Sequence, residues 1–125
     1  MMKHHDLGRS VEEAMISFER LVAVRSEPDV LALGRARVIL VQRVNAYIAH
    51  LGLLVREKRG LENLCAWRQA YADLVELRGR YSEHIALFSP ASTQANWQAY
   101  QESSRGLIIA MQAHIKEVSA WKPID

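Results

Sequence analysis

The sequence contains few of the residues that interrupt helices or crosslink chains. Among 125 residues it has only 3 prolines, 6 glycines and one cysteine, Cys65. The low proline and glycine content argues against long low-complexity or disordered tracts. A single cysteine cannot close a disulfide within the chain, and no basic start is followed by an apolar run of signal-peptide length. These absences favour a folded cytoplasmic protein.

The sequence also lacks long apolar runs and a large excess of charge of one sign. The most apolar stretches, residues 38–41 and 48–55, are bounded by polar residues and fall short of the roughly 20 apolar residues that span a bilayer. We therefore expect no membrane span. The formal net charge is only +2, and basic residues alternate with acidic ones. This pattern argues against nucleic-acid binding, so the arginines in the middle of the chain are interpreted as a solvated helix face.

Half of the residues are hydrophobic, which is enough for one core. They recur every three or four positions, the spacing of one helix face, and no segment alternates with period two long enough for a strand. The expected helices cover about residues 10–25, 27–58, 61–88 and 94–121, after a flexible N-terminal tail over residues 1–9. Four amphipathic helices with short connections bury their stripes only against one another. The prediction is therefore an all-α, antiparallel up-and-down four-helix bundle over residues 10–125.

Local signals mark the expected helix ends. Ser10 and Glu13 have the spacing of a capping box, which predicts the start of the first helix. Pro28 suits the first turn of the second helix, and Gly60 suits a residue just past its end. Pro90 ends the third helix, because proline disfavours helical geometry in the residue before it.

The third helix has the clearest heptad, in which Leu74 and Tyr81 are expected core residues and Arg78 is the one charged member. Replacing Leu74 or Tyr81 with alanine is expected to cost roughly 2–5 kcal/mol. Cys65, near the start of this helix, is interpreted as a small packed residue, with a redox role as the alternative.

Three histidines are the main candidates for chemistry. His50, His84 and His114 each lie on the core-facing edge of a different helix, so they are candidate metal ligands. Because the third helix runs opposite to its neighbours, His84 is expected at the other end of the bundle from His50 and His114. The positions four or five residues later, where carboxylate ligands of a di-iron centre would stand, are occupied by Leu54, Phe88 and Ser119. We therefore expect core-edge histidines that bond to carbonyls or neighbouring side chains.

The order of helices and several local stretches resemble the hemerythrin-like cation-binding family over about residues 10–123. The stretches are His50-Leu51 with Glu57, the Ser89-Pro90 break followed by Trp97 and Tyr100, and residues 114–117 before a terminal Trp-x-Pro. The resemblance implies a four-helix scaffold with a di-iron centre held by histidines, a glutamate and an aspartate. Only His50, His84 and His114 match those ligands, and the first helix has no matching histidine.

The sequence therefore predicts a non-catalytic hemerythrin-like bundle, an interaction or regulatory protein that has lost its di-iron site. It has no Gly-x-Ser-x-Gly elbow, phosphate-binding glycine loop or His-Glu-x-x-His helix, so no enzyme activity and no cofactor are expected. The alternative is a residual metal-binding protein in which His50, His84 and His114 hold iron or another cation. The expected partner is another protein or a second copy of the chain in a homodimer.

Overall fold

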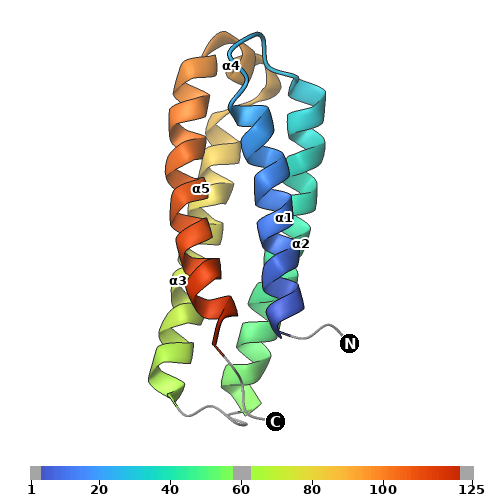
Figure 1. Ribbon diagram of the computed structural model, residues 1–125. Helices are drawn as coiled ribbons and strands as arrows, with labels where there is room; N and C mark the ends of the chain where they lie inside the picture. The colour runs from blue at the N-terminus through green and yellow to red at the C-terminus, as the bar shows by residue number, and fades with distance from the viewer. Residues whose placement is uncertain (1–3, 58–62, 122–125) are drawn as a thin grey trace.

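The computed structural model describes residues 4–57 and 63–121, and every regular element within these ranges is a helix. Four long helices lie side by side, and a short one precedes the last (Figure 1). They are α1 (His4–Val22), α2 (Val30–Glu57), α3 (Leu64–Leu87), α4 (Pro90–Ala95) and α5 (Trp97–Ser119). The prediction of an all-α protein is confirmed. Gly60, expected to follow the second helix, lies outside the described residues.

The helices form a ring around one core. Helix α1 packs against α2 and α5, and α3 packs against the same two helices. The chain ascends α1, descends α2, ascends α3 and descends α5 (Figure 1). The start of α1 and the end of α5 therefore lie at the same end of the molecule, while α4 and the connection from α1 to α2 lie at the other.

The core is built from the inward faces of the four long helices. Leu74 and Tyr81, expected in the core from the heptad, are 0% and 3% exposed. Burying a large apolar side chain contributes about 1.5–3 kcal/mol, so these stripes supply the main driving force for the fold. The largest fully buried side chains are Tyr47, Tyr100, Phe18, Met15, Leu33, Leu40, Leu51, Leu74, Ile115, Val11, Val22 and Val44.

Three of the helices begin at a residue whose side chain accepts a hydrogen bond from a free backbone amide. Asp29 Oδ1 accepts from the amide of Ala32 at 3.0 Å, just before α2. Asn63 caps α3 in the same way, and Ser89 caps α4 with Pro90 in its first turn. Each such cap is worth about 1 kcal/mol. The second helix thus starts at Val30, slightly later than predicted.

The predicted tail over residues 1–9 is wrong for residues 4–9, which form the first turns of α1. Ser10 lies inside this helix, so the capping box does not mark its start. Helix α1 is longer because its first turns pack against the end of α5. His4 is 6% exposed, and a Cβ added to Gly8 would lie 2.5 Å from the Cβ of Ser119.

The other end of α1 is also held by α5. The Gln101 side-chain amide donates to the carbonyl of Val22 at 2.8 Å, and the Trp97 indole N–H donates to the carbonyl of Val24 at 3.1 Å. The last carbonyls of a helix have no partner within it, so these bonds satisfy groups that would otherwise cost free energy. Hydrogen bonds therefore hold helices α1 and α5 together at both ends.

Among the described residues, α2 is long and apolar enough to cross a membrane by length and composition alone. No such segment was predicted from the sequence, because its uninterrupted apolar runs are short. A core helix of a soluble protein passes the same test. Helix α2 does pack against α1 and α3, but most of its apolar window is not buried. It therefore carries more apolar surface than the core can cover.

We predict that Gly8→Ala destabilises the protein, because the new methyl group meets Ser119 on the opposing helix and the backbones must move apart. The expected loss is roughly 1–3 kcal/mol, typical of overpacking. The matched control is Gly106→Ala in α5, where nothing lies within 4 Å of the added Cβ. That change should stabilise by about 0.5–1 kcal/mol, the ordinary helix preference of alanine over glycine. Urea denaturation measures the free energy of unfolding of both variants. An equal gain in stability in the two would refute the close contact between Gly8 and Ser119.

Candidate functional site

Two histidines form a bonded pair near the chain ends. His4 Nε2 lies 2.7 Å from the carbonyl oxygen of Val118, which can only accept, so this nitrogen carries the proton. The other nitrogen, Nδ1, lies 3.0 Å from His50 Nε2 and therefore accepts from it when both rings are neutral. The pair joins α1, α2 and α5. Sequence reasoning placed His4 in a tail and missed it.

Aromatic rings surround this pair. The rings of Tyr47 and Trp67 lie 5.5 Å and 5.3 Å from the His4 ring, measured between centroids. Burial lowers the pKa of His4, and it also lowers the pKa of His50, which the neighbouring His4 lowers further. Burial raises the pKa of the Tyr47 hydroxyl. The cluster therefore favours neutral groups, and the hydrogen bonds between them tie three helices together.

His84 lies in a second polar cluster, between α3 and α5. Its Nδ1 is 2.7 Å from Ser103 Oγ and its Nε2 is 3.1 Å from Ser104 Oγ, so both ring nitrogens have partners. The ring is 3% exposed. Burial lowers the pKa of His84 to about 4, and the nearby Arg37 cation acts in the same direction. His84 is thus neutral at physiological pH.

His114 has a third environment. Its Nε2 lies 2.8 Å from the carbonyl oxygen of Ala70 and donates to it, joining α5 to α3. Its Nδ1 is buried and has no partner within the described part of the chain.

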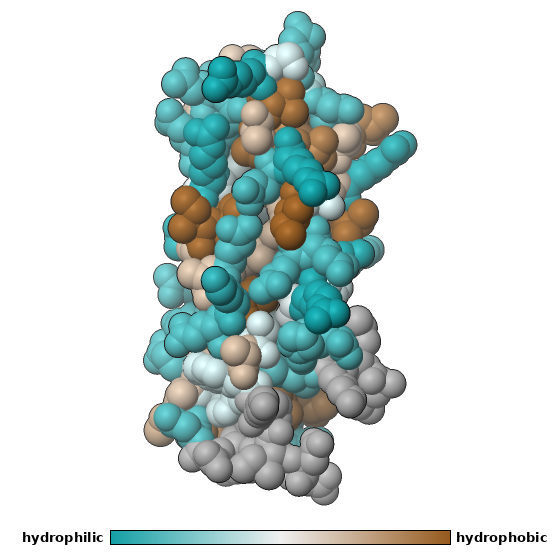
Figure 2. All heavy atoms as spheres, viewed as in Figure 1, coloured by the Kyte–Doolittle hydropathy of each residue, from teal (hydrophilic) through white to brown (hydrophobic). Residues whose placement is uncertain are grey.

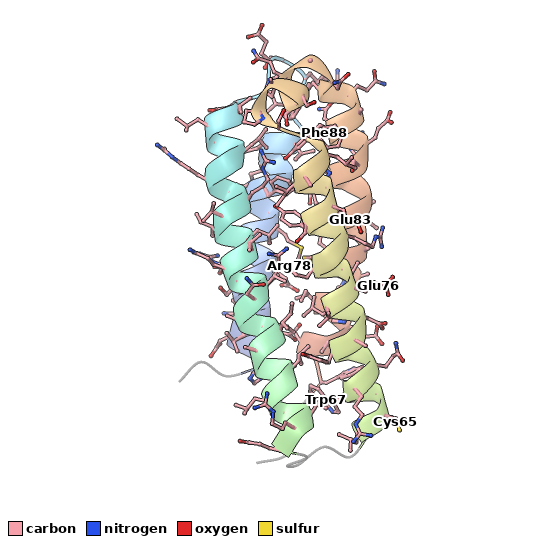
Figure 3. All side chains as sticks on the ribbon, turned by 180° about the vertical axis from the view of Figure 1, so that it is seen from behind. Cys65, Trp67, Glu76, Arg78, Glu83 and Phe88 are labelled. Carbon is pink, nitrogen blue, oxygen red and sulfur yellow. The ribbon has the colours of Figure 1, made fainter. Side chains whose placement is uncertain are left out.

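Helix α3 also bonds to α2, because Arg78 donates to Asn45 Oδ1 at 3.0 Å and its side chain points toward α2 (Figure 3).

The structure does not bring His50, His84 and His114 together. His84 bonds to Ser104, whereas the His4–His50 pair bonds to Val118, which lies 14 residues further along α5. At 1.5 Å per residue this separation is roughly 21 Å. Within residues 4–57 and 63–121, no group of three or more histidine, cysteine or acidic side chains has the arrangement to hold a metal ion. Each predicted ligand instead bonds to a carbonyl or a neighbouring side chain.

Cys65 is exposed on α3, which contradicts its interpretation as a packed residue. Figure 3 places it at the start of that helix and away from Trp67, which points between α2 and α3.

A surface hollow that was not predicted from the sequence lies on the first half of α2. Leu31, Val38 and Ile39 are 67%, 58% and 43% exposed, although all three are large and apolar. They surround an open hollow of about 820 Å³. Its lining is completed by Val30, Gly34, Arg35 and Pro90. Figure 2 shows apolar residues along the right-hand edge of the molecule, on the side where α2 lies in Figure 1.

Gly34 gives the hollow its depth. An added Cβ at this position would meet nothing within 4 Å, so the helix surface is open there between the turns that carry Leu31 and Val38. Among the residues that the structure describes, Arg35 is the one charged member of the lining. Contiguous exposed apolar surface of this kind marks interaction sites in monomeric proteins.

Comparisons of the chain with models of known protein families, with curated proteins and with solved structures gave no match.

We predict that the free energy of unfolding falls as the pH drops from 6.5 toward 4. The folded-state pKa of His84 lies below its unfolded value of 6.5, so unfolding takes up a proton within this window. The contribution of His84 to the free energy of unfolding, roughly 3 kcal/mol, is fully present above pH 6.5 and mostly lost by about pH 4.

The measurement is urea denaturation at several pH values. His84→Gln keeps hydrogen-bonding capacity toward the two serines and should flatten the decline, while the lowered pKa values of His4 and His50 leave part of it in place. The control, His5→Gln, removes an exposed imidazole and should follow the wild type. A wild-type slope in His84→Gln would contradict this assignment.

Proposed function

We propose that this protein is a non-catalytic interaction module, built as an up-and-down four-helix bundle, that binds a helical segment of a protein partner. The binding surface is the apolar hollow on α2. The observation that carries the proposal is the exposure of Leu31, Val38 and Ile39 around one opening. Single exposed apolar residues are ordinary on a protein surface, but three around one hollow are not.

The shape of the hollow favours a helix as the occupant. Leu31 and Val38 are seven residues apart, which is about two helical turns, and Ile39 follows Val38, so the three lie in a stripe along one side of α2. Gly34 opens a notch within this stripe that can receive one side chain of a partner. An amphipathic helix inserts apolar side chains at the same spacing, which is the ordinary mode of recognition by helical grooves.

Charge favours a partner that carries a carboxylate. Arg35 is exposed at the hollow, and no acidic residue lines it. A guanidinium binds a carboxylate through two parallel hydrogen bonds, which adds orientation to the apolar contact. A second copy of this chain would place another Arg35 at the same opening in a two-fold contact, and like charges disfavour that arrangement. We therefore assign an acidic amphipathic helix rather than self-association.

The bonds of His4 and His84 support a structural rather than a chemical role for these two residues. Both ring nitrogens of His4 and of His84 take part in hydrogen bonds, so neither ring has a nitrogen left for a substrate or an ion. A general base needs a free acceptor within reach of the proton it removes. The hemerythrin-like resemblance remains a hypothesis about the scaffold, and it does not extend to a shared site for His50, His84 and His114.

The proposal predicts that acidic amphipathic peptides bind the α2 hollow. Helical peptides of random sequence would be selected on the wild-type protein and depleted on Val38→Asp, which places a charge among apolar side chains. Selected peptides should carry an apolar stripe and at least one Asp or Glu. Their dissociation constants, measured by titration calorimetry, should rise at least about tenfold in Val38→Asp, the loss of roughly 1.4 kcal/mol.

The matched control is Ile109→Asp, which places the same charge on an apolar side chain of α5 that is 66% exposed. It should leave peptide binding unchanged. Gly34→Leu should also abolish binding by filling the notch, whereas Gly106→Leu should not, since both glycines face open space. Equal binding by Val38→Asp and Ile109→Asp would refute the site. A dimer of the unliganded protein that Val38→Asp dissociates would refute the choice of occupant.

A further inference from the structure

A buried arginine lies inside the helix ring, on the opposite side of α2 from the hollow. Arg37 is 9% exposed and follows the inward residue Leu33 by one helical turn. Its guanidinium carbon lies 5.6 Å from the centroid of the Tyr100 ring. The His84 and Tyr100 rings are 4.9 Å apart, and those of Tyr81 and His84 are 6.2 Å apart. Side chains from α2, α3 and α5 thus meet around one cation.

The charge of Arg37 has no anionic partner in the part of the chain that the structure describes. The charged side chains that act on the pKa values of Tyr81, His84 and Tyr100 are Arg37 and Arg78, both cations. An arginine side chain carries a permanent positive charge, and withdrawing part of an ion from water costs free energy that a nearby counter-charge recovers. A cation–π contact returns up to about 2 kcal/mol, which offsets only part of that cost.

Two hydroxyl groups beside the arginine are buried without a partner. Tyr81 Oη and Tyr100 Oη form no hydrogen bond within the described ranges. Ser104 lies close enough to Tyr100 to lower its pKa, but the geometry of the pair is not that of a hydrogen bond. Burial outweighs this and raises the pKa of both tyrosines, so both hydroxyls keep their protons. The cluster therefore has one fixed cation, two unused donors and no anionic acceptor.

We propose that Arg37, Tyr81 and Tyr100 bind a small monovalent inorganic anion of the chloride class inside the bundle. An anion supplies both the missing counter-charge and an acceptor for the two hydroxyls. The surrounding rings are closely packed, with centroids 4.9 Å and 6.2 Å apart, which favours a single small ion over an organic acid. A water molecule would satisfy the hydroxyls and leave the arginine charge unpaired. A metal cation would be repelled by Arg37.

The test compares melting temperatures in sodium chloride and in sodium gluconate at equal ionic strength, because gluconate is too large for the cluster. A ligand that binds only the folded state raises the melting temperature by mass action. Chloride should raise it by roughly 3–8 °C relative to gluconate once it exceeds its dissociation constant about tenfold, and the increment should saturate. A melting temperature that is equal in the two salts would overturn the proposal.

Two further variants identify the residues. Arg37→Met should lose the chloride increment, and Arg35→Met, which removes an exposed arginine from the same helix, should keep it. Tyr81→Phe preserves the ring and removes only the hydroxyl, so it keeps the fold even if Arg37→Met does not. It should reduce the chloride increment while leaving the melting temperature in gluconate unchanged or higher. A full increment in both Arg37→Met and Tyr81→Phe would place chloride elsewhere and overturn the assignment.

Discussion

Helix α2 has apolar side chains on two sides, and a ring of four helices can bury only one of them. Leu33, Leu40 and Val44 face inward and are at most 2% exposed. Leu31 and Val38 lie on the outward side of the same turns, where more than half of each side chain is exposed. An exposed stripe of this kind loses the favourable transfer of apolar surface from water, about 25 cal/mol per Å². A partner that covers it recovers that free energy, which is why the proposed binding surface is the hollow on α2.

The rest of the structure holds α2 in this orientation. Helices α1 and α5 are joined at one end by His4 and Val118 and at the other by Gln101 and Val22. His50 extends the first of these connections to α2. Buried polar bonds of this kind contribute little net stability, but leaving one unmade costs about 1–3 kcal/mol, so they disfavour a rotated helix. The buried stripe of α2 and the His4–His50 bond at one end of the ring together fix which face of α2 points outward.

The sequence was sufficient for the helical class and for much of the core, because periodicity reports which side of each helix is apolar. Leu74 and Tyr81 are buried as their spacing predicted. The start of α1 could not be predicted, because a capping box is a local signal. The contacts that extend the helix join His4 and Gly8 to residues more than a hundred positions away.

The candidate sites were predicted only in part. His84 is buried and lies far from His114, as the helix directions indicated. Arg37 was interpreted as part of a solvated face, although its spacing from Leu33, Leu40 and Val44 already placed it on the inward stripe. The exposed positions of Val38 and Ile39 were not predicted, because a continuous apolar run does not reveal which of its members face out. Choosing between the two sides requires knowing which neighbours α2 has.

The most direct test of the outward face is site-specific photo-crosslinking in cells that produce the protein. A photoreactive phenylalanine analogue would replace Val38 in one sample and Ile109 in another, since both side chains are exposed on different helices. The account predicts one discrete adduct from position 38 and none from position 109. The crosslinked peptide should map to an amphipathic helical segment of another protein that contains Asp or Glu. Adducts of equal yield from both positions, or an adduct to a second copy of this chain, would contradict it.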